Sequence, residues 1–171
     1  DMSCRVMEAL SKFPAEVEIY SIDEAFLLVS CRGGYADMGR QISQTVRAWT
    51  GIPVSIGIAP TKVLAKIANE EAKTCRRHGG VFDLSSLPDS GANALLRRFP
   101  VRDVWGIGPR YAFRLKELGI DNALALKRSD PRLIRKVMTV VGERIVRELN
   151  GTPCISLEPV PRDKKEIACS R

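Results

Sequence analysis

The chain has 171 residues, of which 44% are hydrophobic and 27% are charged. This composition is typical of a folded globular protein rather than a disordered one. No apolar run approaches the roughly 18 residues that a membrane-spanning helix needs, so we expect no membrane span. The five cysteines are scattered without a CxxC pair, which favours reduced thiols in a cytosolic protein over a disulfide framework or a zinc site.

The net positive charge of the chain comes entirely from its second half. The whole sequence carries 27 Lys and Arg against 20 Asp and Glu, a net charge of +7. Residues 1–91 have 10 basic and 11 acidic side chains (net −1), whereas residues 92–171 have 17 and 9 (net +8). A one-sided basic field favours a polyanionic partner, nucleic acid before a membrane surface. A charge that serves only solubility is an equal alternative on this observation alone.

The first half alternates strand and helix signals, and the second half is helical. Apolar spacing predicts helices at about 2–12, 37–50 and 61–73, and short β-type runs predict strands at 17–20, 25–30, 53–59 and 81–84. Further helices are expected at about 91–98, 101–105, 109–118, 121–128, 130–138 and 142–149, with no strand before about Ile167. We therefore expect an α+β fold: an antiparallel or mixed sheet with packed helices, followed by a small all-helical unit.

Two adjacent carboxylates, Asp23 and Glu24, lie at the bend of the predicted strand–turn–strand hairpin. A bend can turn both toward one point, where Mg²⁺ would relieve their repulsion and keep water ligands for a phosphate substrate. A solvated turn is the commoner outcome for such a pair taken alone.

The helix predicted from Thr61 places Lys62, Lys66, Asn69 and Lys73 on one face. A row of ammonium groups suits the oxygens of a phosphate. A hydrated surface, partly balanced by neighbouring glutamates, is the more frequent interpretation of such a row without other context.

A tight corner is predicted in the basic half by the pattern Gly106-Ile107-Gly108 between two helical runs. The glycines allow a close backbone approach, and the free N–H groups of the following helix can bind a phosphate. Arg110 and Arg114 add positive charge on that helix. The pattern resembles a helix-hairpin-helix motif, and it favours sequence-independent DNA binding over a plain helix corner. By contrast, His78 is the sole histidine, which argues against a histidine-based triad or a multi-histidine metal site.

Three segments, in this order and spacing, resemble the Y-family translesion DNA polymerases: YSIDEAF at 20–26, GIAPTKVLAKIAN at 57–69 and VWGIG at 104–108. The wider segment EIYSIDEAF at 18–26 and EIACSR at 166–171 resemble the UmuC branch of that family. The resemblance implies a partial polymerase palm at 1–90, a helical thumb with the helix-hairpin-helix at 91–162, and the start of a linker and little-finger domain at 163–171.

The same resemblance implies roles for particular residues. Asp23 and Glu24 would be catalytic carboxylates of a site for two Mg²⁺ ions, and Lys73 would contact the triphosphate of the incoming nucleotide. Segment 106–110 would hold the DNA backbone. The implied partners are primed, damaged template DNA, deoxynucleoside triphosphates, a UmuD′ dimer, the RecA filament and the sliding clamp, in the bacterial cytoplasm during the SOS response.

The sequence departs from the family pattern before the first motif. The family's first metal-binding aspartate, its N-terminal strand and its fingers have no counterpart in these 171 residues. We therefore expect the parent protein to be an error-prone polymerase and this segment alone to be inactive. A non-catalytic polymerase-like scaffold and a simple DNA-binding module are the alternatives.

Overall fold

The structure, a computed structural model, describes residues 2–31 and 33–158. The first half contains helices α1 (Met2–Leu10), α2 (Tyr35–Thr50) and α3 (Lys62–Thr74), and strands β1 (Ala15–Ile19), β2 (Ala25–Val29), β3 (Ile56–Ile58) and β4 (Val81–Asp83). The second half contains helices α4 (Asp89–Arg98), α5 (Pro109–Glu117), α6 (Ala123–Lys127) and α7 (Pro131–Leu149). The end of the expected thumb, the strand near Ile167 and the expected linker at 163–171 lie outside the described residues.

The strands form two separate two-stranded sheets, whereas we expected one sheet. Strands β1 and β2 pair antiparallel from Ala15 opposite Val29 to Ile19 opposite Ala25, and β3 pairs parallel with β4. No described strand pairs with members of both sheets, so they remain apart. The α+β class is confirmed, and the hairpin between β1 and β2 is the one that the sequence predicts.

Local signals set most helix ends. Thr61 precedes α3, and its hydroxyl accepts a hydrogen bond from the backbone N–H of Leu64 at 3.4 Å, which satisfies one of the free donors of the first turn. Gly51 ends α2 in the left-handed conformation (φ 75°) and donates its N–H to the carbonyl of Arg47. Pro109 occupies the first turn of α5, where its missing N–H costs nothing.

One helix prediction differs from the structure, and a predicted break between two others is confirmed. Residues 101–103 form a single 3₁₀ turn rather than a helix to 105, because the chain reverses at Gly106, which has a positive φ of 88°. The two helices expected at 130–138 and 142–149 are both present within α7, where a kink with a non-helical backbone at Thr139 (φ 68°, ψ −166°) separates them. This conformation is strained for a β-branched residue, and it marks the break that the sequence predicts.

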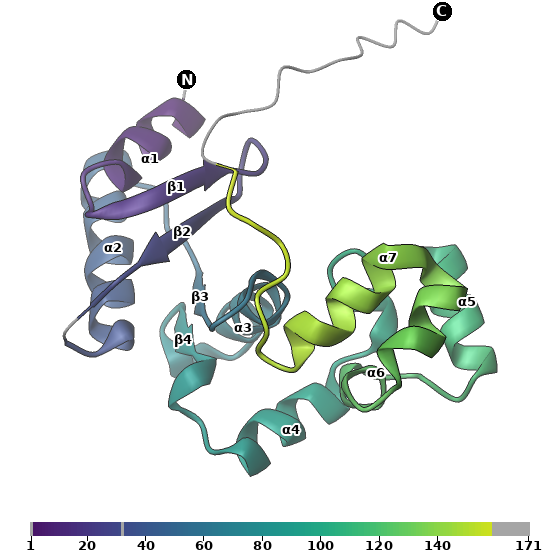
Figure 1. The fold of residues 1–171 in the computed structure, drawn as a ribbon. Coiled ribbons are helices and arrows are strands. Elements are labelled where there is room, and N and C mark those ends of the chain that lie inside the picture. Colours follow the sequence, from purple (N-terminus) through teal and green to yellow (C-terminus); the bar gives the residue numbers. More distant parts are fainter. Residues whose placement is uncertain (1, 32, 159–171) are drawn as a thin grey trace, which may run out of the picture.

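Two apolar cores hold the molecule together. The smaller one joins Ala9 and Leu10 of α1 to Ile42 and Val46 of α2 beneath the β1–β2 hairpin. The larger one runs without interruption from α3 through β4 into α4–α7. In Figure 1, α1 and α2 lie on one side of the hairpin, α4–α7 gather on the other side of the molecule, and α3 lies between them. Helix α3 therefore anchors the helical half to the strands.

The position of α3 depends on one glycine. A Cβ atom at Gly57 of β3 would lie 2.0 Å from the backbone nitrogen of Asn69 and 2.4 Å from the carbonyl oxygen of Ala65. Strand β3 and helix α3 therefore approach each other more closely than any side chain allows. This contact sets the distance between α3 and the rest of the first half.

Candidate active site and nucleic-acid surface

The acidic bend between β1 and β2 is shaped by its own backbone and by Ser21. The N–H groups of Tyr20 and Ser21 both donate to the carbonyl of Glu24, at 3.0 and 3.1 Å. The hydroxyl of Ser21 donates to Oδ1 of Asp23 at 2.7 Å and accepts from the N–H of Asp23 at 3.4 Å. The bend is thereby held in a single compact loop that presents the carboxylate of Asp23.

The pKa of Asp23 is lowered from its ordinary value of 3.8, mainly by the hydrogen bond from Ser21 and further by the positive charges of Lys73 and Lys66. Asp23 is therefore ionised at neutral pH, and its negative charge is within electrostatic reach of α3.

Glu24 faces α3 directly. Its Oε1 lies 2.5 Å from Nζ of Lys66, in an ion pair whose side chains are partly buried. The Lys66 ammonium also lies over the ring of Tyr20, 5.8 Å from its centroid. A cation thus already occupies the position beside Glu24.

A pocket of about 610 Å³ opens between the acidic bend, α3 and the helical half. Its lining includes Glu24, Lys66, Asn69 and Lys73, and the opposite wall contributes Asp103 and Trp105. The side-chain oxygen of Asn69 is buried, and no donor within the described part of the chain reaches it. The predicted acidic bend and two of the three predicted lysines therefore meet at one polar pocket.

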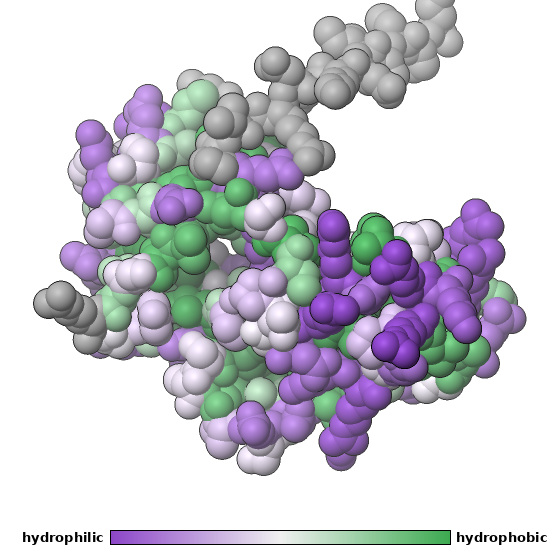
Figure 2. Space-filling model, viewed as in Figure 1, coloured by the Kyte–Doolittle hydropathy of each residue, from purple (hydrophilic) through white to green (hydrophobic). Residues whose placement is uncertain are grey.

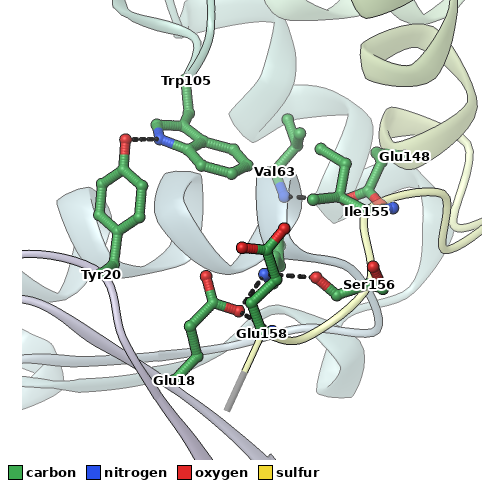
Figure 3. A network of polar contacts seen from close by, with 9 residues as sticks. Glu18, Tyr20, Val63, Trp105, Glu148, Ile155, Ser156 and Glu158 are labelled. Carbon is green, nitrogen blue, oxygen red and sulfur yellow. Dashed lines mark hydrogen bonds and ion pairs between the residues drawn. The ribbon is translucent and has the colours of Figure 1, made fainter. Parts of the chain in front are cut away.

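Lys62 does not share that surface, which corrects the expected row of four. Its side chain is 10% exposed, and its Nζ lies 2.5 Å from Oε2 of Glu18 and donates to the carbonyl of Ser156 at 2.8 Å. Figure 3 shows Glu18 and Ser156 facing this point from β1 and from the segment after α7. Because the Lys62 ammonium is paired with groups of the protein itself, Lys62 is not among the residues that we propose to contact phosphate.

The aromatic residues Tyr20, Phe26 and Trp105 join the bend to the helical half, a role that the sequence did not indicate. The indole N–H of Trp105 donates to the hydroxyl of Tyr20 at 3.2 Å (Figure 3). The Trp105 ring lies 5.5 Å from that of Tyr20 and 5.6 Å from that of Phe26. Trp105 packs against the larger core and also lines the pocket, where it is partly exposed.

The corner predicted at Gly106–Gly108 is a tight turn before α5. Gly106 has a φ of 88°, and a Cβ there would lie 3.0 Å from Cδ1 of Ile145. Ile107 is buried in the larger core and donates its N–H to the carbonyl of Val104 at 3.0 Å. Gly108 precedes the first turn of α5, whose early N–H groups lack intrahelical partners.

Arg110 and Arg114 lie exposed on α5. In Figure 2 strongly hydrophilic residues gather over the helical half of the molecule. The described part of this half, residues 92–158, carries 13 Lys and Arg against 7 Asp and Glu. The excess of positive charge that the sequence predicts is therefore displayed on the surface around α5 and α7.

Comparison with known proteins identifies the class. Residues 1–70 match the model of the impB/mucB/samB family. A solved structure of a DinB family error-prone DNA polymerase from Sulfolobus solfataricus is similar to 93% of this chain, with a TM-score of 0.71 and 27% identity, over 46% of that chain. The fold is thus similar to that of part of a solved error-prone DNA polymerase.

Particular relatives match the whole chain. UmuC of Salmonella typhimurium strain LT2 is 48% identical over 100% of this chain, and SamB of Salmonella typhimurium is 45% identical over 99%. The chain spans 41% of the length of each. It is therefore a homologue of UmuC and SamB, and the resemblance to the UmuC branch is confirmed. No described helix has both the length and the apolar character needed to cross a membrane.

Proposed function

We propose that this chain is the palm-and-thumb segment of a template-directed translesion DNA polymerase. The observation that carries the proposal is the pocket lined by both Glu24 and Lys73, beside the bend that holds ionised Asp23. Carboxylates and ammonium groups gathered at one open pocket suit the binding of a nucleoside triphosphate with divalent cations. The similarity to a solved error-prone DNA polymerase supports the same function.

Asp23 and Glu24 are the residues that would hold Mg²⁺. Both offer the oxygen donors that this ion prefers, Asp23 is exposed at the bend, and Glu24 already has a cation 2.5 Å from its carboxylate. Two such ions would neutralise the charge that develops on the transferred phosphate and on the primer hydroxyl. The donor set fits, and Lys66 must withdraw from Glu24 when a metal ion binds there.

The remaining residues bind substrate. Lys73, and Lys66 once it is released from Glu24, hold the triphosphate at the pocket. The turn at Gly106, Ile107 and Gly108, with Arg110 and Arg114 on α5, grips the DNA backbone as a helix-hairpin-helix without reading sequence. Trp105 and Asp103 line the same pocket.

The expected division into a palm at 1–90 and a thumb at 91–162 also belongs to this proposal. The larger core includes α3 as well as α4–α7, so we propose that the thumb is seated on the palm through α3. The shared core would keep the DNA-binding corner at a constant distance from the acidic bend.

The substrates and partners that the resemblance implies are also part of the proposal. The proposed substrates are primed template DNA and deoxynucleoside triphosphates, and the proposed setting is error-prone repair in the SOS response of the bacterial cytoplasm. A UmuD′ dimer, the RecA filament and the sliding clamp are proposed as partners of the full-length protein. We propose that these 171 residues alone are inactive, because Asp23 and Glu24 are two of the three carboxylates that the resemblance implies.

Primer extension by the full-length protein tests the proposal. We expect Asp23→Asn and Glu24→Gln each to reduce the rate by at least about 10²-fold. Glu16→Gln, an exposed position on β1, should retain parental activity as the matched control. Equal rates for all three variants would refute the assignment of the carboxylates.

Two further outcomes of the same experiment distinguish the alternatives. A parent protein that binds primed DNA but never extends it would indicate the non-catalytic scaffold. DNA binding that is unaffected by Mg²⁺ in both the parent and Asp23→Asn, again without extension, would indicate a simple DNA-binding module.

A further inference from the structure

Three side chains that can bind metal meet where α3 ends: Glu71, Cys75 and His78. One ligand atom from each lies within 4.8 Å of the others. Cys75 follows Glu71 by one helical turn, and the 3₁₀ turn at Arg76–His78 brings the histidine back toward the helix. We propose that these residues form a binding site for a zinc-like divalent metal ion, separate from the acidic bend.

Backbone hydrogen bonds hold the three residues close to one another. Cys75 donates its N–H to the carbonyl of Glu71 at 3.0 Å, and His78 donates to the carbonyl of Cys75 at 3.1 Å. The ring of His78 rests against Phe82, with 4.5 Å between centroids. The ligands are therefore positioned by local hydrogen bonds and by one apolar contact, with no metal required to assemble them.

The distances suit a tetrahedral ion. Bonds of about 2.0–2.3 Å to nitrogen, oxygen and sulfur place neighbouring ligands about 3.3–3.8 Å apart. Nε2 of His78 lies 3.6 Å from Oε1 of Glu71, which is already within that range. The widest separation, 4.8 Å or less, must close by about 1 Å, which small side-chain rotations supply.

Glu71 already pairs with a positive charge, which a metal ion would have to displace. Oε1 of Glu71 lies 2.5 Å from Nη2 of Arg98, whose side chain is 65% exposed while that of Glu71 is 14% exposed. The Arg98 side chain is mostly exposed, so it can turn into solvent when a metal ion binds Glu71. A bound metal ion would then replace one positive partner of Glu71 with another.

The donor set selects the metal, and the surroundings provide an open position. A thiolate and an imidazole favour Zn²⁺ or Co²⁺ over Mg²⁺. A pocket of about 320 Å³ adjoins the three ligands and is lined partly by Phe82 and Leu87, so a water molecule or an added ligand can take the fourth position.

The site is independent of the proposed polymerase function. Glu71 and Lys73 project about 160° apart around α3, and they line different pockets. The absence of a CxxC pair and of a second histidine argued against a zinc site in the sequence. The structure assembles one from a single histidine, one cysteine and one glutamate.

Cobalt titration of the reduced, metal-free 171-residue chain tests the proposal. We expect one Co²⁺ per chain, with the visible bands of a tetrahedral ion and a thiolate-to-cobalt charge-transfer band, and displacement by one equivalent of Zn²⁺. Added Mg²⁺ should leave the spectrum unchanged. Absence of the thiolate band, or its loss on addition of Mg²⁺, would overturn the proposal.

Variants separate this site from adventitious binding. Cys75→Ser should abolish the charge-transfer band and His78→Gln should weaken binding at least about tenfold, whereas Cys4→Ser, an exposed cysteine in α1, should behave as the parent. Arg98→Gln should tighten binding by about two- to fivefold, because it removes the competing cation. Parental binding by Cys75→Ser would contradict the site, and so would weaker binding by Arg98→Gln. The two variants test the site independently, so one remains informative if the other folds poorly.

Discussion

We expect replacement of Glu148 by glutamine to destabilise the fold. Glu148 lies at the end of α7 and is 0% exposed. Its Oε2 accepts from the N–H of Val63 at 3.1 Å (Figure 3). Its Oε1 accepts from the N–H groups of Cys154 and Ile155 at 2.7 and 3.0 Å. Its backbone carbonyl accepts from the hydroxyl of Thr61 at 2.9 Å. One residue thus joins the start of α3, the end of α7 and the segment that follows.

The magnitude follows from these bonds. A hydrogen bond to a charged group contributes about 1.5–3 kcal/mol, and a neutral one about 0.5–1.5 kcal/mol. In Glu148→Gln the amide oxygen can keep the bonds from Cys154 and Ile155 in weaker form, but its NH₂ group then faces the N–H of Val63. We therefore expect a loss of about 2–4 kcal/mol in the free energy of unfolding. Glu148→Ala leaves one buried donor (Val63) and two partly buried donors (Cys154 and Ile155) without a partner and should cost more.

Urea unfolding followed by circular dichroism measures this loss. Glu117→Gln, at the exposed end of α5, is the matched control and should change the free energy of unfolding by less than about 0.5 kcal/mol. If Glu148→Gln were as stable as this control, the buried carboxylate would not carry the connection between α3 and α7.

Three further predictions concern the acidic bend and the corner before α5. The pKa of Asp23, followed by NMR, should lie below 3.8 and should rise in Ser21→Ala. Ionised Asp23 stabilises the fold at pH values above the pKa that Asp23 has in the unfolded chain. This contribution is lost as the pH falls through the lower pKa of the folded protein. An unchanged pKa in Ser21→Ala would contradict this account. Arg110→Ala should reduce the salt dependence of DNA binding by about one unit of slope, while Lys62→Ala should leave that slope unchanged and lower stability; the opposite pattern would return Lys62 to the DNA surface. Gly106→Ala should cost about 1–2 kcal/mol in thermal unfolding because of its positive φ, and a neutral effect would show that the corner relaxes.

Features that depend on neighbouring residues were predictable. The hydroxyl of Thr61 at the start of α3, Pro109 at the start of α5 and Gly51 after α2 each act within one turn of their own position. The bend at Asp23 and Glu24 follows from two short strands joined by polar residues. These are local interactions, so a linear pattern contains the information that they need.

Contacts between distant segments were not predictable in the same way. Lys62 and Lys66 are one helical turn apart, and periodicity places them on the same face of α3. Lys62 binds Glu18 and the carbonyl of Ser156, residues 44 and 94 positions away, whereas Lys66 faces Glu24 at the pocket. Nothing in the periodicity of α3 distinguishes the two lysines, because the difference comes from the partners that the fold brings to each.

The sequence by itself determined the α+β class, the acidic bend, the basic second half and the relationship to the Y-family polymerases, since each is a matter of residue order or composition. The tertiary structure alone decided which lysines reach the pocket, that Trp105 meets Tyr20, that Glu148 joins α3 to α7, and that Glu71, Cys75 and His78 converge beside Arg98. These contacts depend on how the helices pack in three dimensions. Burial and charge pairing between the packed elements then decide whether a polar side chain pairs with another group of the protein or remains available to a ligand.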